Sequence, residues 1–99
     1  YEAKRATLAA IAYDGPVYIR IGREKTPVVT SVGSPFEIGK GEVYYQKNQD
    51  HKRSVAIVVN GTLLFSALTA AVMLEKEGIG VSVANIATVK PLDTALLDT

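Results

Sequence analysis

The sequence predicts an α/β protein whose middle is a βαβ unit: a strand, a helix and a second strand joined by short connections. Three observations lead to this prediction. An uncharged β-branched run covers Val55–Val59, an Ala- and Leu-rich stretch follows over Thr62–Glu77, and a second segment with the pattern of a strand covers Val81–Ile86. Such a unit makes two parallel strands through a right-handed crossover. We therefore expect a parallel sheet with this helix packed against it.

A helix is expected at the start of the chain, over residues 1–12. It contains five alanines, which are strong helix formers, and Leu8 and Ile11 are expected to supply its apolar contacts. Asp14–Gly15 is expected to end the helix. Pro16–Ile21 then alternates apolar and polar side chains with the period of a β-strand, so a strand is predicted there.

The rest of the chain before the βαβ unit reads as a connector and a short strand. Residues 24–38 contain two prolines and a glycine with little helical periodicity, which is typical of a linker between domains. Glu42–Gln46 is predicted to be a short edge strand, followed by a polar turn over residues 47–53. The apolar strand Val55–Val59 is of the type that is covered on both faces. Near the end of the chain, Asp93 is expected to cap a helix.

Composition excludes several classes of function. The 99 residues carry 11 Lys and Arg against 10 Asp and Glu, a net charge of +1, which offers no general attraction for nucleic acid. There is no cysteine, so disulfides, thiolate metal sites and cysteine nucleophiles are excluded. A single histidine without a cluster of carboxylates does not predict a metal site.

One uncharged stretch, from Val55 to Leu74, is as long as a membrane span. It is interrupted by the turn sequence Asn60–Thr62, and its two halves differ in composition: the first is β-branched, while the second is rich in Ala and Leu and carries Ser66 and Thr69. These features favour a strand, a turn and a helix over a transmembrane segment. No membrane partner is expected.

The turn Asn60–Gly61–Thr62 is the first candidate for a binding site, because it follows a buried strand and opens a helix. Ligands of open parallel sheets bind at this edge, and the free amides and dipole of a helix start favour an anion. A single glycine is not the G-x-G-x-x-G pattern of a dinucleotide site. The alternative is a tight turn with Thr62 near the helix cap, which every such unit needs, and the residues alone favour it.

Two arginines, Arg20 and Arg23, flank the end of the first predicted strand. Arginine is the side chain best suited to grip a phosphate or carboxylate in a bidentate manner. From the residues alone, a surface ion pair with Glu24 is the favoured alternative. His51 lies in a charged turn without a placed partner, so it receives no catalytic role. No catalytic residue and no metal ligand is assigned.

Four segments carry motifs that occur together, in this order, in one family. Gly15–Arg23 resembles the "GPVYIRxGR" end of a pyrimidine-binding domain, and Pro35–Val43 resembles the "PFEIGKAEV" start of a C-terminal domain. Val55–Thr62 is similar to a "VAIVATGT" strand and turn, and Lys90–Asp93 matches the end of "T(I/V)KPLD". Together they resemble the transketolase-like group of thiamine-diphosphate enzymes, along essentially the whole chain. At its position in this motif, Asn60 replaces the small residue that is more common. This difference affects the assignment to a branch of the family, but not the assignment to the family.

The resemblance implies a division of the chain. Residues 1–23 would be the C-terminal end of a pyrimidine-binding-like domain, namely its last helix and strand. Residues 24–38 would be the interdomain linker, and residues 39–99 the N-terminal part of the transketolase C-terminal domain. The family's domain is longer, the chain begins with Tyr1, and it stops at the start of a predicted helix. We therefore expect a partial sheet that leaves an edge and an apolar face uncovered. Such a truncated domain would be poorly stable alone, or it would be part of a longer polypeptide.

The resemblance also implies a function. Transketolases move a two-carbon ketol unit between sugar phosphates with thiamine diphosphate and Mg²⁺, which are held by parts of the enzyme that are absent here, so this chain alone is expected to bind neither. One position carries over: Arg23 matches the arginine that grips the substrate's phosphate, whereas Arg20 does not. Asn60, Gly61 and Thr62 remain a weaker candidate for an anion. The chain would supply structure, subunit assembly and phosphate contact, without catalysing by itself.

The expected partners are the rest of a transketolase chain or a separate N-terminal-section subunit, in a cytoplasmic homo- or hetero-oligomer such as a dimer. Deoxyxylulose-phosphate synthase and the β subunits of 2-oxo-acid dehydrogenases share the layout and are alternatives. A non-catalytic α/β binding or assembly module is a further alternative. Thiamine dependence separates the enzymes from the module, and the substrate range separates the enzymes from one another.

Overall fold

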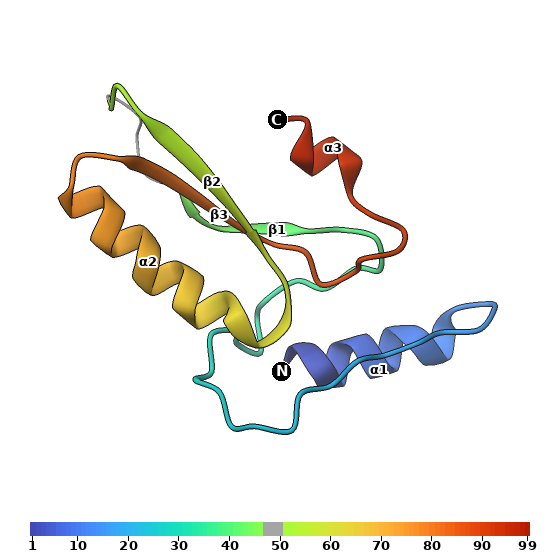
Figure 1. Cartoon of the computed structure of the whole chain (residues 1–99). Coiled ribbons are helices and arrows are strands. Elements are labelled where there is room, and N and C mark those ends of the chain that lie inside the picture. Colours follow the sequence, from blue (N-terminus) through green and yellow to red (C-terminus); the bar gives the residue numbers. More distant parts are fainter. Residues whose placement is uncertain (47–50) are drawn as a thin grey trace.

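The structure is a computed structural model that describes residues 1–46 and 51–99. Its elements in chain order are α1 (Glu2–Ala12), β1 (Glu42–Gln46), β2 (Ser54–Val59), the 3₁₀ turn η1 (Gly61–Leu63), α2 (Leu64–Lys76), β3 (Gly80–Asn85) and α3 (Thr94–Leu97) (Figure 1). The predicted α/β class is confirmed. Of the polar turn predicted over residues 47–53, residues 47–50 lie outside the described residues.

The three strands form one sheet in the order β1-β3-β2. β2 and β3 are parallel, with Ser54 opposite Gly80 and Val59 opposite Asn85. β1 pairs with the other side of β3 in the antiparallel direction. The parallel βαβ unit and the position of β1 at an edge are therefore as predicted. Because a parallel pair needs a crossover, the 13-residue helix α2 carries the chain from the end of β2 to the start of β3.

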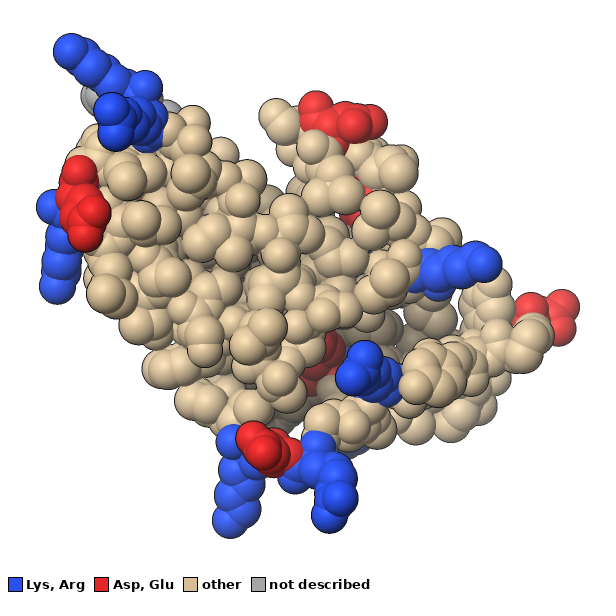
Figure 2. All heavy atoms as spheres, in the orientation of Figure 1, with Lys and Arg blue, Asp and Glu red and all other residues tan. Residues whose placement is uncertain are grey.

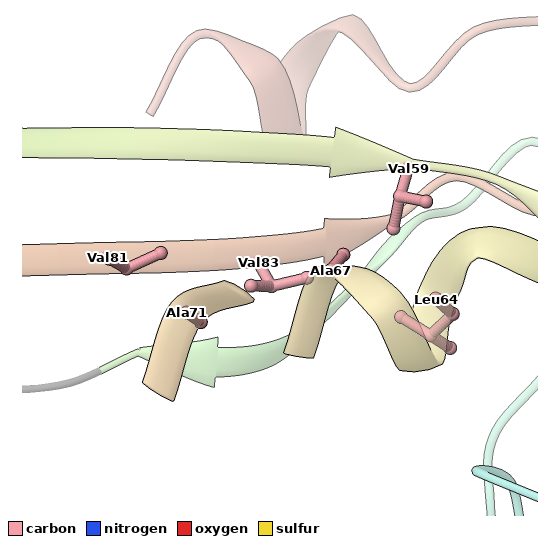
Figure 3. Packing of buried hydrophobic residues seen from close by; sticks show 6 residues of the cluster. All are labelled: Val59, Leu64, Ala67, Ala71, Val81 and Val83. Carbon is pink, nitrogen blue, oxygen red and sulfur yellow. The ribbon is translucent and has the colours of Figure 1, made fainter. Parts of the chain in front are cut away.

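α2 covers one face of the sheet and forms the hydrophobic core with it (Figure 3). The core consists of small and branched side chains from β2, α2 and β3: Val59, Leu64, Ala67, Ala71, Val81 and Val83. Alanines on the buried side of α2 let the helix approach the strands closely. The helix ends before Gly78, as predicted, and Glu75 in its last turn accepts a hydrogen bond from the Val81 amide at 3.0 Å.

The run Val55–Val59 has the composition of a strand covered on both faces, but in this chain it has an uncovered face, as expected for a partial sheet. β2 lies at the second edge of the sheet, and most of its residues are exposed, including Val55 at 43% and Val58 at 52%. Figure 2 shows a largely uncharged surface over β2 and α2, with Lys, Arg, Asp and Glu gathered at its margins. The uncharged stretch Val55–Leu74 thus forms part of a surface that no other described residues cover.

The N-terminal segment differs from the prediction in two respects. The predicted helix is present as α1, but it has no buried residue, and Leu8 and Ile11 are 57% and 77% exposed instead of packed. The strand predicted over Pro16–Ile21 is absent among the described residues, because a strand needs a neighbour to complete its hydrogen bonds and none lies beside this segment. Residues 24–38 contain no helix or strand, as predicted.

Candidate functional site

The two positions that the sequence singled out for anion binding lie together in the structure. Arg23 and Thr62 line one open hollow of about 320 Å³, together with Gly22, Glu24, Thr26 and Leu63. Arg23 comes from the extended segment after α1, and Thr62 comes from η1 at the start of α2. Asn60 and Gly61 are not among the lining residues, so the predicted turn reaches this hollow through Thr62.

The turn before α2 is shaped by one glycine. Gly61 has a φ of +66°, a conformation that L side chains rarely adopt, and this allows the chain to pass from β2 directly into η1. Asn60 is extended and makes no side-chain hydrogen bond to the helix start. The first amides of a helix have no partners within the helix and carry partial positive charge. Thr62 therefore brings an electropositive turn to the hollow that Arg23 also lines.

Gly22 and Thr62 are in close contact at the same place. A Cβ atom at Gly22 would lie 2.9 Å from the Cγ2 methyl of Thr62. That distance is shorter than real Cβ contacts, so this position admits glycine without movement and a larger residue only with displacement. Gly22, the residue next to Arg23, thus rests against the C-terminal unit, which we define as β1 to α3. The sequence singled out Arg23 and Thr62, but not Gly22 or its contact with Thr62, which depends on the path of the chain between α1 and β1.

A second polar cluster, centred on Asn85 at the end of β3, was not predicted. Asn85 is 4% exposed, and its amide Nδ2 donates to the Glu2 carboxylate of α1 at 2.8 Å. Burial raises the pKa of Tyr44 to about 12, assisted by the charge of Glu42, its hydrogen bond and the charge of Glu2. Glu2, Glu42 and Asn85 also line a hollow of about 140 Å³. The available signal was only that Asn85 is a polar residue at the end of a predicted strand.

Asp93 gives the Lys90–Asp93 motif a structural role. It caps α3 as predicted, accepting from the Leu96 amide at 3.2 Å, and it also accepts from the Gly41 amide at 3.0 Å. The hydrogen bonds from the Gly41 and Leu96 amides lower the pKa of Asp93, and the charge of Lys40 acts in the same direction. In addition, Gly39 donates its amide to the Thr88 hydroxyl at 3.0 Å. The segment before β1 is thereby tied to the segment after β3.

His51 lies beside Glu75 of α2. Its Nε2 lies 3.4 Å from the Oε2 of Glu75, whose side chain is 5% exposed. This pair connects the approach to β2 with the last turn of α2, and the Glu75 bond to the Val81 amide extends the connection to β3. Glu75 was not predicted to have this role, because its partners come from other elements.

Two kinds of site receive no support from the residues that the structure describes. Within residues 1–46 and 51–99, no group of three or more His, Cys, Asp or Glu is placed to hold a metal ion. Over the same ranges, no helix is long and apolar enough to cross a membrane.

Comparison with known proteins places these features in a family. The family model "Transketolase, C-terminal domain" matches residues 44–99. The 1-deoxy-D-xylulose-5-phosphate synthase of Leptothrix cholodnii is 41% identical over 102 residues, which cover 98% of this chain and 15% of that protein. The transketolase of Rattus norvegicus is 34% identical over 94 residues, which cover 95% of this chain and 15% of that protein.

A solved structure agrees with these relatives. It is described as a split-gene transketolase in an inactive beta4 tetramer, and it matches with a TM-score of 0.82 and 41% sequence identity. The match covers 94% of this chain and 29% of that chain. This chain therefore spans less than a third of the length of each of these three proteins.

Proposed function

This chain belongs to the transketolase family through its C-terminal domain, and on that basis we propose that it is the C-terminal section of an enzyme that transfers two-carbon ketol units between sugar phosphates, such as pentose phosphates. Its contributions are structure, subunit assembly and, through Arg23, contact with the substrate's phosphate. The chain does not catalyse the transfer alone.

The observation that carries the phosphate role is the hollow that contains Arg23. A guanidinium that is open to solvent and has room beside it can approach a phosphate with two parallel hydrogen bonds. The hollow of about 320 Å³ gives that room, and Thr62 brings the electropositive start of α2 to its wall. The proposed anion-binding turn, Asn60 to Thr62, thus acts together with Arg23 and not as a separate site.

The described part of this chain offers no cluster of ligands for Mg²⁺. Magnesium requires oxygen ligands from carboxylates and phosphates, and residues 1–46 and 51–99 present no suitable cluster of three or more His, Asp or Glu. We assign thiamine diphosphate and Mg²⁺ to other parts of the complete enzyme and derive no step of the reaction through them here. What this chain does in the reaction is to hold and orient the phosphate end of the sugar.

The proposed partners are the preceding part of the same polypeptide or a separate N-terminal-section subunit, within a cytoplasmic dimer or larger oligomer. The name of the structural neighbour refers to a split gene and to a tetramer, which supports a chain that works in association. The exposed apolar side chains of the N-terminal segment support it as well, because Leu8, Ile11 and Tyr18 would be covered in such an assembly.

One other branch of the family is a second candidate. The identity of 41% to a 1-deoxy-D-xylulose-5-phosphate synthase is as high as that to the split-gene transketolase. Both assignments keep a phosphorylated sugar substrate and therefore the same role for Arg23. They differ in the donor of the two-carbon unit, so an assay with a ketose phosphate as the donor, compared with an oxo acid as the donor, separates them.

The proposal is tested by Arg23→Gln in the complete enzyme, with Arg20→Gln as the matched control. The value of kcat/KM is measured for a pentose phosphate acceptor and for the free pentose. Charge-assisted hydrogen bonds contribute about 1.5–3 kcal/mol, so we expect a loss of about ten- to a hundredfold with the phosphorylated acceptor only. An unchanged preference for the phosphorylated acceptor in Arg23→Gln, or an equal loss in Arg20→Gln, would contradict the proposed role.

A further inference from the structure

We infer that Thr62 is a positioning residue for Arg23: its methyl group is the support against which Gly22 rests, and this contact sets where the guanidinium lies. The inference rests on the phosphate role proposed for Arg23. It adds that the C-terminal domain takes part in substrate recognition by holding a neighbouring segment in place, in addition to its role in assembly.

Arg23 lies in an exposed segment with few contacts to the rest of the molecule. Residues 11–28, which include Arg23, are all exposed, and no helix or strand lies between α1 and β1. Such a segment has little buried surface to fix its path. The Gly22 contact with the Cγ2 of Thr62, where an added Cβ would lie 2.9 Å away, is a point at which it meets the C-terminal unit. A support adjacent to Arg23 therefore has a large influence on its position.

Thr62 itself is held firmly in place. Thr62 lies within η1, two residues before Leu64, which is 6% exposed and belongs to the hydrophobic core. On its other side, Gly61 and the end of β2 connect it to the parallel sheet. Thr62 is thus held on both sides by the best-packed part of the molecule. The packed core therefore fixes the position of Thr62, and the contact between Thr62 and Gly22 fixes the position of Arg23.

The Thr62 side chain can have two roles, one for its methyl group and one for its hydroxyl group. Its methyl group contacts Gly22, whereas its hydroxyl group is able to donate a hydrogen bond to an anion in the shared hollow. Positioning requires the methyl group, and direct phosphate binding requires the hydroxyl group. Thr62→Ser removes the methyl and keeps the hydroxyl, while Thr62→Val keeps a methyl at the contact and removes the hydroxyl. The two variants are therefore a matched pair.

The experiment measures kcat/KM of the complete enzyme for a pentose phosphate acceptor and for the free pentose. Displacing a binding group by about 1 Å can cost up to a hundredfold, and for this exposed contact we expect a loss of about tenfold in Thr62→Ser, with the phosphorylated acceptor only. Thr62→Val keeps the methyl and is expected to lose less kcat/KM than Thr62→Ser. A loss in Thr62→Val as large as in Thr62→Ser, or no loss in Thr62→Ser, would overturn the inference.

A second measurement tests the contact itself. Gly22→Ala places a methyl 2.9 Å from the Thr62 methyl, so one of the two groups must move, and we expect weaker use of the phosphorylated acceptor. In the double variant Gly22→Ala with Thr62→Ser, the added and removed methyl groups compensate, and we expect at least half of the lost kcat/KM to return. Strictly additive losses would overturn the inference. If Arg23→Gln itself leaves phosphate preference unchanged, the proposed function fails first, which distinguishes the two failures.

Discussion

The two longest helices both contain several alanines, but they lie in different environments. α1 and α2 are both rich in alanine, yet α1 buries no residue, while α2 buries Leu64, Ala67 and Ala71 against the sheet. In α2 the alanines allow close approach to β3, and in α1 the same residue type contributes only helix propensity. The comparison teaches that an apolar helix pattern predicts a buried face, but the partner that buries it must be present.

The attachment of the two helices to the rest of the molecule differs in kind as well. α2 is held by apolar packing, whereas α1 is held by polar contacts: Glu2 accepts from Asn85, and the Arg5 guanidinium donates to the Ser34 carbonyl. These few polar contacts contribute less stability than a packed core does. We therefore expect the C-terminal unit to be the stable part of this chain and the N-terminal segment to depend on other parts of the enzyme.

The largest expected effect is that of a cavity in the core. Val83→Ala removes two methyl carbons from a fully buried side chain of β3, whereas Leu8→Ala shortens a side chain that is 57% exposed on α1. We expect Val83→Ala to lower the free energy of unfolding by about 2 kcal/mol. For Leu8→Ala, a change within about 0.5 kcal/mol is expected. Urea unfolding measures both, and equal losses would show that the two segments do not differ.

A second prediction concerns the contact between Asp93 and Gly41. The pKa of Asp93 is lowered below 3.8 by the two amide hydrogen bonds. A carboxyl group whose folded-state pKa is depressed stabilises the fold above its unfolded pKa, and this stabilisation is lost as the pH falls through the folded-state pKa. The melting temperature of the natural chain is therefore expected to fall as the pH is lowered below about 4.

Asp93→Asn tests this dependence, with Asp98→Asn as the control of equal charge. We expect Asp93→Asn to melt at a lower temperature at pH 6 and to lose less stability between pH 5 and pH 3. Asp98 is exposed near the end of the chain, so Asp98→Asn is expected to keep the natural pH dependence. If Asp93→Asn keeps the full acid sensitivity of the natural chain, the carboxylate is not the group responsible.

The smallest effect is expected at the polar attachment of α1. Glu2→Ala removes the acceptor for the buried Asn85 amide, which corresponds to about 1 kcal/mol for a lost hydrogen bond. Hydrogen exchange should become faster in α1 and remain unchanged in α2. Glu2→Gln keeps an acceptor oxygen and should exchange as the natural chain does. Faster exchange in α2 after Glu2→Ala would show that the two helices are one cooperative unit.

The sequence predicted the local elements of the C-terminal unit well, because their signals are local. The β-branched run of β2, the turn at Gly61, the helix ending before Gly78 and the cap at Asp93 each depend on residues close in the chain. The strand predicted over Pro16–Ile21 failed, because strand formation depends on a neighbouring strand that no local pattern can supply.

The candidate site could be predicted only in part. Arg23 and the turn at Thr62 were identified separately, one from a resemblance and one from its position at a strand end. Their meeting in one hollow, and the Gly22 contact with Thr62, depend on how the linker returns to the start of α2 (Figure 1). The cluster of Glu2, Tyr44 and Asn85 joins residues from distant parts of the chain, so no spacing in the sequence indicated it.

The most direct test of the difference between the two regions is hydrogen exchange of this 99-residue chain alone and of the same residues within the complete enzyme. We expect α2 and β3 to be protected in both samples, because their core lies within this chain. Residues 1–32 should exchange rapidly in the isolated chain and become protected in the complete enzyme. Strong protection of residues 1–32 in the isolated chain, equal to that of α2, would contradict this account.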